Sequence, residues 1–238
     1  MTEAAAFPHA VAAPALPARL IGLYLTISFP ILAVLVAVRL VMTPLFLQIE
    51  YNRPGFPVDA YGFTTADRLR YGPYALDYLL NAEGIEYLGD LTFPDGTSMY
   101  NVRELRHMRD VKTVTQAAFA VALIGGALAL IGAFVLWRSP ATRRPLWLAL
   151  RAGALFNLVL IAAIVVVVVG NWNFFFTAFH QVFFAEGTWI FLYSDTLIRL
   201  FPEQFWFDAA ITIGSLTVLA ALVTLAIAQR SLMRLPPP

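Results

Sequence analysis

The sequence contains no cysteine, and this absence removes several classes of protein from consideration. A disulfide-stapled ectodomain, a quinone–thiol oxidoreductase and an enzyme with a thioester intermediate all require cysteine. Charged residues are also scarce, at 13% of the chain, whereas 60% of the residues are hydrophobic. With a mean hydropathy of +0.72, the chain is too apolar and too poor in charge for a soluble domain.

Motifs of several common enzyme classes are missing as well. The sequence has no nucleophile elbow, phosphate-binding loop, HExxH pair or dinucleotide fingerprint. Apart from His9 in the N-terminal tail, the sequence offers only His107 and His180, and two imidazoles without further His or Cys make a poor zinc site. We therefore expect neither a metal nor another cofactor. The net charge of +1 gives no reason to expect a nucleic-acid partner.

Long apolar runs, in contrast, are abundant. A run of about 20 apolar residues is enough for a helix to cross a bilayer, and four runs meet this length. They cover residues 20–47, 115–137, 152–169 and 209–228. The sequence therefore predicts an all-α integral membrane protein with four transmembrane helices. Its membrane domain is expected over residues 20–230, between a disordered tail (1–19) and a short tail (231–238).

The placement of charge predicts the orientation of the chain. All carboxylates except Glu3 lie in the segments 48–113 and 170–208. The two tails and the connection between the second and third spans carry arginines instead, namely Arg19, Arg138, Arg143, Arg144, Arg151, Arg230 and Arg234. By the positive-inside rule, both termini are cytoplasmic and the two carboxylate-rich segments face outward.

The segment 48–113 is predicted to fold as a small extracytoplasmic cap of short helices plus a β-hairpin. "TTADRLRYGPYALDYLLNAEG" has helical spacing, and we expect Pro73 to split it into two short helices. "LTFPDGTSMY" places a Pro-Asp-Gly turn between two β-prone runs, which indicates a hairpin. Asn101 and Glu104 form a capping-box pattern, so a helix should start near Val102 and continue into the second span.

The segment 170–208 is crowded with Phe and Trp but contains too many charges to be a further span. Such a composition favours an aromatic helical segment that lies in the membrane interface. His180 falls in it, with Phe176 and Phe184 four residues away on either side.

His107 and His180 are the candidate catalytic residues, because both are expected near the same depth on the outer side. Asp110, one turn after His107, could hold its Nδ1–H, although an ion pair with Arg106 or Arg109 explains Asp110 as well. Arg39 is expected near the outer boundary of the first span, where an unpaired charge suggests a site. Interfacial packing without any catalytic role remains open for both histidines.

Three motifs in order resemble the bacterial lipoprotein intramolecular transacylase (Lit) family. They are "ELRHMRDVK" at 104–112, "AFHQVFF" at 178–184 with a following Trp, and "DTLIRLFPEQFW" at 195–206. The likeness covers residues 20–230 and includes the number of spans and the outward cap. It implies an enzyme of the bacterial cell membrane that moves the sn-2 acyl chain of an S-diacylglyceryl cysteine to the α-amine of the same cysteine, giving a lyso-form lipoprotein. The implied partners are a diacylated lipoprotein and membrane lipids.

The resemblance also implies that His107 and His180 match the two catalytic histidines of the family. We expect His107, oriented by Asp110, to act as general base, and His180 to donate to the oxyanion or to the departing oxygen. Arg39 is a supporting residue, and Phe183, Phe184 and Trp189 are expected to line the acyl-binding groove. The alternative is a non-catalytic four-span scaffold protein, for which changes to the histidines would be silent.

Overall fold

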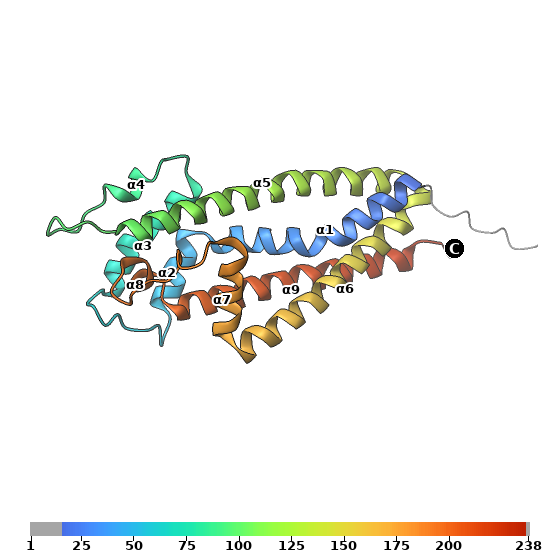
Figure 1. The fold of residues 1–238 in the computed structure, drawn as a ribbon. Coiled ribbons are helices and arrows are strands. Elements are labelled where there is room, and N and C mark those ends of the chain that lie inside the picture. The colour runs from blue at the N-terminus through green and yellow to red at the C-terminus, as the bar shows by residue number, and fades with distance from the viewer. Residues whose placement is uncertain (1–15, 237–238) are drawn as a thin grey trace, which may run out of the picture.

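The computed structural model describes residues 16–236 and places four long helices side by side in a bundle (Figure 1). These helices are long and apolar enough to cross a membrane, which confirms the predicted number of spans within the described residues. They are α1 (Leu16–Val41), α5 (Val102–Arg138), α6 (Pro140–Gly170) and α9 (Glu203–Arg234). The described start and end of the chain lie at the same end of the bundle.

The first span is shorter than predicted. Helix α1 ends at Val41, and Thr43 begins the separate helix α2 (Pro44–Asn52) by accepting a hydrogen bond from the N–H of Phe46. Pro44 has no N–H and disfavours a helical conformation of the residue before it, so an apolar run that continues to residue 47 cannot remain one helix. The tail boundaries also shift, because α1 already begins at Leu16 and α9 continues to Arg234. Residues 1–15 of the predicted tail lie outside the described residues.

Small residues and buried hydrogen bonds hold the spans together. A Cβ atom on Gly153 of α6 would lie only 2.9 Å from the Cβ of Phe29 on α1. Asn157 donates to the Thr217 carbonyl of α9 at 3.2 Å, and the Tyr24 hydroxyl donates to the Gly125 carbonyl of α5 at 2.7 Å. Close backbone approach and interhelical hydrogen bonds are the usual means of helix association where the solvent is lipid.

The cap contains α2, α3 (Thr65–Leu80), α4 (Glu86–Gly89) and α8 (Thr196–Leu200). The predicted break at Pro73 is wrong, since α3 runs through it. Buried side chains on both sides of the proline, including Tyr71 and Tyr78, pack into one core with Leu88 and Leu200. This packing outweighs the loss of the single hydrogen bond that a proline N–H cannot make.

The predicted β-hairpin is also wrong. The turn itself forms, with Gly96 at φ +84° and the N–H of Gly96 donating to the Phe93 carbonyl. Only an isolated bridge between Thr92 and Ser98 follows, and residues 16–236 contain no strand. The segments on either side of the turn are too short to form further β-bridges. A two-stranded hairpin without a third strand is also only marginally stable.

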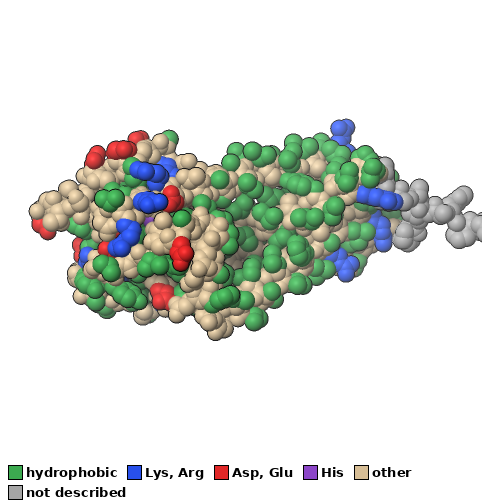
Figure 2. Space-filling view, in the orientation of Figure 1, with side chains coloured by type: hydrophobic (Ala, Val, Ile, Leu, Met, Phe, Trp, Pro, Cys, Tyr) green, Lys and Arg blue, Asp and Glu red, His purple; other side chains and the backbone are tan. Residues whose placement is uncertain are grey.

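Helix α7 (Trp172–Phe183) crosses the bundle next to the cap, at a steep angle to the spans (Figure 1). It follows α6 directly, and Asn171 caps it by accepting from the N–H of Phe174 at 3.0 Å. In Figure 2, hydrophobic side chains cover the middle of the molecule. Charges of both signs gather over the cap, and only Lys and Arg appear at the end where the termini lie.

Candidate active site

His107 is placed by the capping box at the start of α5. Asn101 and Glu104 exchange backbone-to-side-chain hydrogen bonds of 2.8 Å and 3.0 Å, as the sequence predicts. Glu104 is only 1% exposed, and its second carboxylate oxygen accepts from the N–H of Leu197 in α8 at 2.7 Å. One carboxylate therefore fixes both the start of α5 and the adjacent α8. His107, one turn further along the same face, is buried beneath this junction.

His180 is held near the end of α7 by its own helix. Its Nδ1 lies 2.7 Å from the backbone carbonyl oxygen of Phe176. A carbonyl can only accept a hydrogen bond, so Nδ1 carries the proton in the neutral ring and Nε2 is left as the acceptor. This contact sets the tautomer of His180.

The two histidines come together across α5 and α7. Their ring centroids are 6.3 Å apart, and the ring planes are inclined by 22°. The two imidazoles are therefore near neighbours, with nearly parallel ring planes.

Aromatic rings surround the pair. The ring centroid of Phe184 lies 5.1 Å from that of His107 and 5.7 Å from that of His180, so Phe184 contacts both histidines. Phe191 lies 5.3 Å from His107, and Trp189 lies 4.7 Å from His180. The structure thus places Phe184 and Trp189 at the site. Phe183 is 47% exposed, and its ring contacts Phe179 and Phe184 rather than a histidine.

Burial keeps both imidazoles neutral. His107 lies on the part of α5 that precedes the apolar run, and burial together with the nearby His180 lowers its pKa to about 4. Burial also lowers the pKa of His180, against the opposing effect of its hydrogen bond to Phe176. Both rings are therefore unprotonated at neutral pH and able to accept a proton.

Two supporting residues are not where the sequence suggested. No hydrogen bond joins Asp110 to His107, whose Nδ1 is buried without a hydrogen-bond partner among the described residues. The structure therefore lacks the orienting contact that was expected of Asp110. Arg39 is exposed, and its Nη1 donates to the Met42 carbonyl at 3.2 Å, so it is engaged at the end of its own helix. The carbonyl of Phe176, which does orient a histidine, has no side-chain signature that a sequence could reveal.

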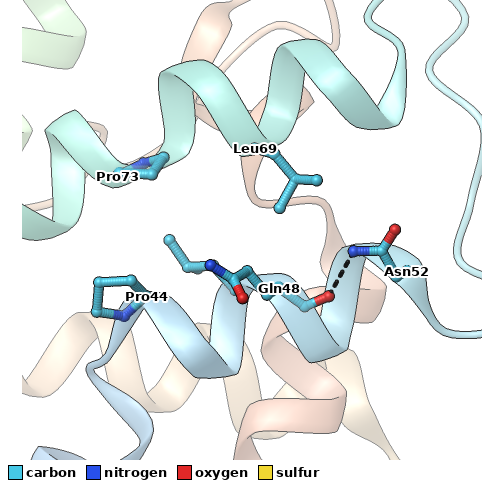
Figure 3. Close-up of a pocket in the computed structure, with 6 residues that line it drawn as sticks. Pro44, Gln48, Asn52, Leu69 and Pro73 are labelled. Atoms are coloured by element: carbon cyan, nitrogen blue, oxygen red, sulfur yellow. Dashed lines mark hydrogen bonds between the residues drawn. The ribbon is translucent and has the colours of Figure 1, made fainter.

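Open grooves elsewhere on the cap do not include the histidines. One groove of about 320 Å³ lies between α2 and α3, with Gln48 and Asn52 on one wall and Leu69 and Pro73 on the other (Figure 3). A second, of about 310 Å³, is lined by Ile85, Val102, Leu105, Arg106 and Arg109. Neither brings together groups for acid–base chemistry, and the paired imidazoles remain the candidate active site.

The sequence model of a family described as lipoprotein intramolecular transacylase Lit matches residues 23–206, which is more than half of the chain. The chain belongs to the Lit family. A solved structure of the membrane-integral lipoprotein intramolecular transacylase Lit from Bacillus cereus has the same fold, with a TM-score of 0.75 at 21% identity. The similarity covers 91% of this chain and 96% of that one. An uncharacterised protein of Aquifex aeolicus is 29% identical over 207 residues, which cover 87% of this chain and 92% of that protein.

Membership of the Lit family defines the general activity. The chain is an acyltransferase, an enzyme of lipoprotein modification with several membrane spans. The predicted resemblance is confirmed, and the alternative of a non-catalytic scaffold protein is set aside.

Proposed function

We propose that this Lit-family enzyme moves the sn-2 acyl chain of an S-diacylglyceryl cysteine to the α-amine of the same cysteine. The product is a lyso-form lipoprotein. The observation that carries the proposal is the pair of imidazoles, His107 buried and His180 half-buried, whose ring centroids lie 6.3 Å apart. Aromatic side chains around the pair suit a lipid-borne substrate.

His180 is the better candidate for the general base. Its Nδ1–H is held by the Phe176 carbonyl, so its Nε2 presents a lone pair in a fixed direction. His107 has no such orienting partner, because the expected contact with Asp110 is not formed. The roles expected from the sequence are therefore exchanged: His180 takes the proton, and His107 donates a hydrogen bond.

The reaction needs only one proton to move. The neutral α-amine attacks the sn-2 ester carbonyl, an N–C bond forms, and the carbonyl electron pair moves to oxygen. His180 Nε2 takes the proton that the attacking nitrogen loses. When the C–O bond to the glyceryl oxygen breaks, His180 returns that proton to the departing oxygen, which His107 holds by a hydrogen bond. An ester and an amine become an amide and an alcohol.

The energetics require no external driving force. Conversion of an ester into an amide is downhill, and the nucleophile and the acyl group belong to one molecule. Holding them in attack geometry removes much of the entropic barrier of a bimolecular reaction. Acid–base assistance by a positioned side chain contributes a further factor of about 10²–10⁴.

The charge distribution favours a site on the extracytoplasmic side. The face in Figure 2 shows only Lys and Arg at the end that carries the termini, and both signs of charge over the cap. By the positive-inside rule this arrangement supports cytoplasmic termini, with the histidine pair at the outer leaflet, where diacylated lipoproteins are anchored.

The test is mass spectrometry of the N-terminal lipopeptide of a lipoprotein, in cells with and without this protein. The wild-type enzyme should yield N-acylated lyso-form lipopeptide, and His107→Ala and His180→Ala should each abolish it. The matched control is Asp110→Asn, a change on the same turn of α5 that leaves the imidazoles in place. Near-normal conversion by either alanine variant would reject the proposed chemistry, provided that both variants reach the membrane in normal amounts.

A further inference from the structure

The histidine pair has a third polar neighbour that carries no hydrogen bond. Seven buried polar side-chain atoms lack a partner within residues 16–236. Two of them, His107 Nδ1 and Trp189 Nε1, belong to rings that neighbour His180. A buried polar group without a partner costs stability, so such groups call for a physical explanation.

The orphan atom of Trp189 can only donate. An indole N–H has no lone pair to offer, so it needs an acceptor. Within residues 16–236 no group accepts from it, including the ring of His180 at 4.7 Å between centroids. The substrate of this site can supply the acceptor, because it contains a carbonyl oxygen that becomes an anion during acyl transfer.

A tight turn fixes the indole in this position. After α7 ends, Gly187 adopts φ +79°, a conformation that few residues other than glycine accept. Thr188 closes the turn through its N–H and its hydroxyl, which donate to the Ala185 carbonyl at 3.2 Å and 2.8 Å. Trp189 follows directly, and its ring lies against His180 with 4.7 Å between centroids.

We infer that the indole N–H of Trp189 donates a hydrogen bond to the ester carbonyl oxygen as negative charge develops on it. This inference rests on the proposed acyl transfer at the histidine pair. A fixed donor in a water-poor site stabilises an oxyanion more than it stabilises a neutral carbonyl, because the electrostatic interaction grows with the charge. Trp189 is therefore a catalytic residue that contacts the reacting oxygen, in addition to being part of the aromatic wall.

The decisive variant is Trp189→Phe, which keeps an aromatic ring against His180 and removes the N–H. With a synthetic diacylglyceryl-cysteine peptide, kcat should fall about 10²–10³-fold, the usual loss for one oxyanion donor. KM should change less than about threefold, since the neutral ground-state carbonyl gains little from the donor. The apparent melting temperature should not fall, because no bond within the protein is lost.

The chain offers a matched control in Trp172→Phe. Trp172 also has a buried Nε1 without a partner within the described residues, but its ring contacts Phe175, Phe176 and Phe207 and no histidine. The kcat of Trp172→Phe should therefore stay within about threefold of the wild-type value. A second probe replaces Trp189 by benzothienylalanine, which has sulfur in place of the N–H and preserves the shape of the indole. It should reproduce the loss of kcat seen with phenylalanine.

The possible outcomes separate this inference from the proposed function. If His107→Ala and His180→Ala are inactive while Trp189→Phe and the benzothienyl variant retain wild-type kcat, only the role of Trp189 is wrong. A loss that appears in KM or in melting temperature but not in kcat also overturns it, because it assigns the indole a packing role. Activity in the histidine variants would instead remove the proposed function itself.

Discussion

Glu104→Gln is the perturbation that most directly probes how the site is built. The Glu104 carboxylate is 1% exposed and accepts two backbone N–H groups, from Asn101 at 2.8 Å and from Leu197 at 2.7 Å. A glutamine has nearly the same shape but only one acceptor oxygen. Whichever way its amide is turned, an NH₂ group must face one of the two backbone donors.

The expected cost follows from that count. One charge-assisted hydrogen bond is lost, and one buried N–H is left without an acceptor, for a total of about 2–3 kcal/mol. For a chain of this size, this loss corresponds to a decrease of roughly 5–10 °C in melting temperature. Because His107 lies one turn beyond Glu104 on the same helix, the acyl-transfer rate should fall as well.

The assay is thermal unfolding of the purified protein in detergent, with Glu186→Gln as the control. Glu186 is exposed and makes no hydrogen bond or ion pair within the described part of the chain, so its replacement should stay within about 0.5 kcal/mol of wild type. Equal melting temperatures for the two variants would show that Glu104 does not join α5 to α8 in the way described.

Three further predictions follow from the geometry. As the pH rises toward 7, kcat/KM should increase, because the substrate amine, with a pKa of about 7.7–8.0, loses its proton. The pKa of His107, lowered to about 4, places its protonation below pH 5, so a step near pH 6.5 that disappears in His107→Ala would contradict the burial of His107. Gly153→Ala should destabilise the bundle by about 1–3 kcal/mol, because the new Cβ would meet Phe29 at 2.9 Å; Gly126→Ala, with nothing within 4 Å, is the control and should not destabilise it in the same melting assay. Arg39→Ala should leave the acyl-transfer rate within about threefold of the wild-type rate, because within the described residues its guanidinium bonds to the Met42 carbonyl at the end of its own helix. A loss of about 10²-fold, the size typical of a catalytic group, would show that Arg39 acts at the site.

The spans and their helical continuity could be predicted because apolar run length and capping chemistry are local. The Asn101–Glu104 box, for example, predicts the start of α5 from four residues. Run length read from hydropathy alone misses the break between Val41 and Pro44, although the Thr43–Pro44 pair is a local signal for the start of a new helix. At Pro73 the error is the opposite one: a break was predicted, but helix α3 continues through the proline. Burial of side chains on both sides of Pro73 outweighs its local tendency to break a helix.

The two histidines of the candidate site could be predicted from the sequence, but their arrangement in space and their contacts could not. Depth and the scarcity of other titratable groups identify His107 and His180, and the structure brings their rings together. Their roles depend on contacts that no spacing encodes. Asp110 stands at a suitable helical interval but does not reach His107, whereas a backbone carbonyl orients His180. The unpaired N–H of Trp189 likewise appears only in the folded structure, where the indole lies beside His180.

Single-turnover rates of acyl transfer for wild type, His107→Ala, His180→Ala and the double variant test the central claim most directly. Two imidazoles that act as a unit on one proton should give non-additive effects, so the double variant should be about as slow as the slower single variant. If the two losses multiply, or if one single variant retains the wild-type rate, the histidines do not work as a pair.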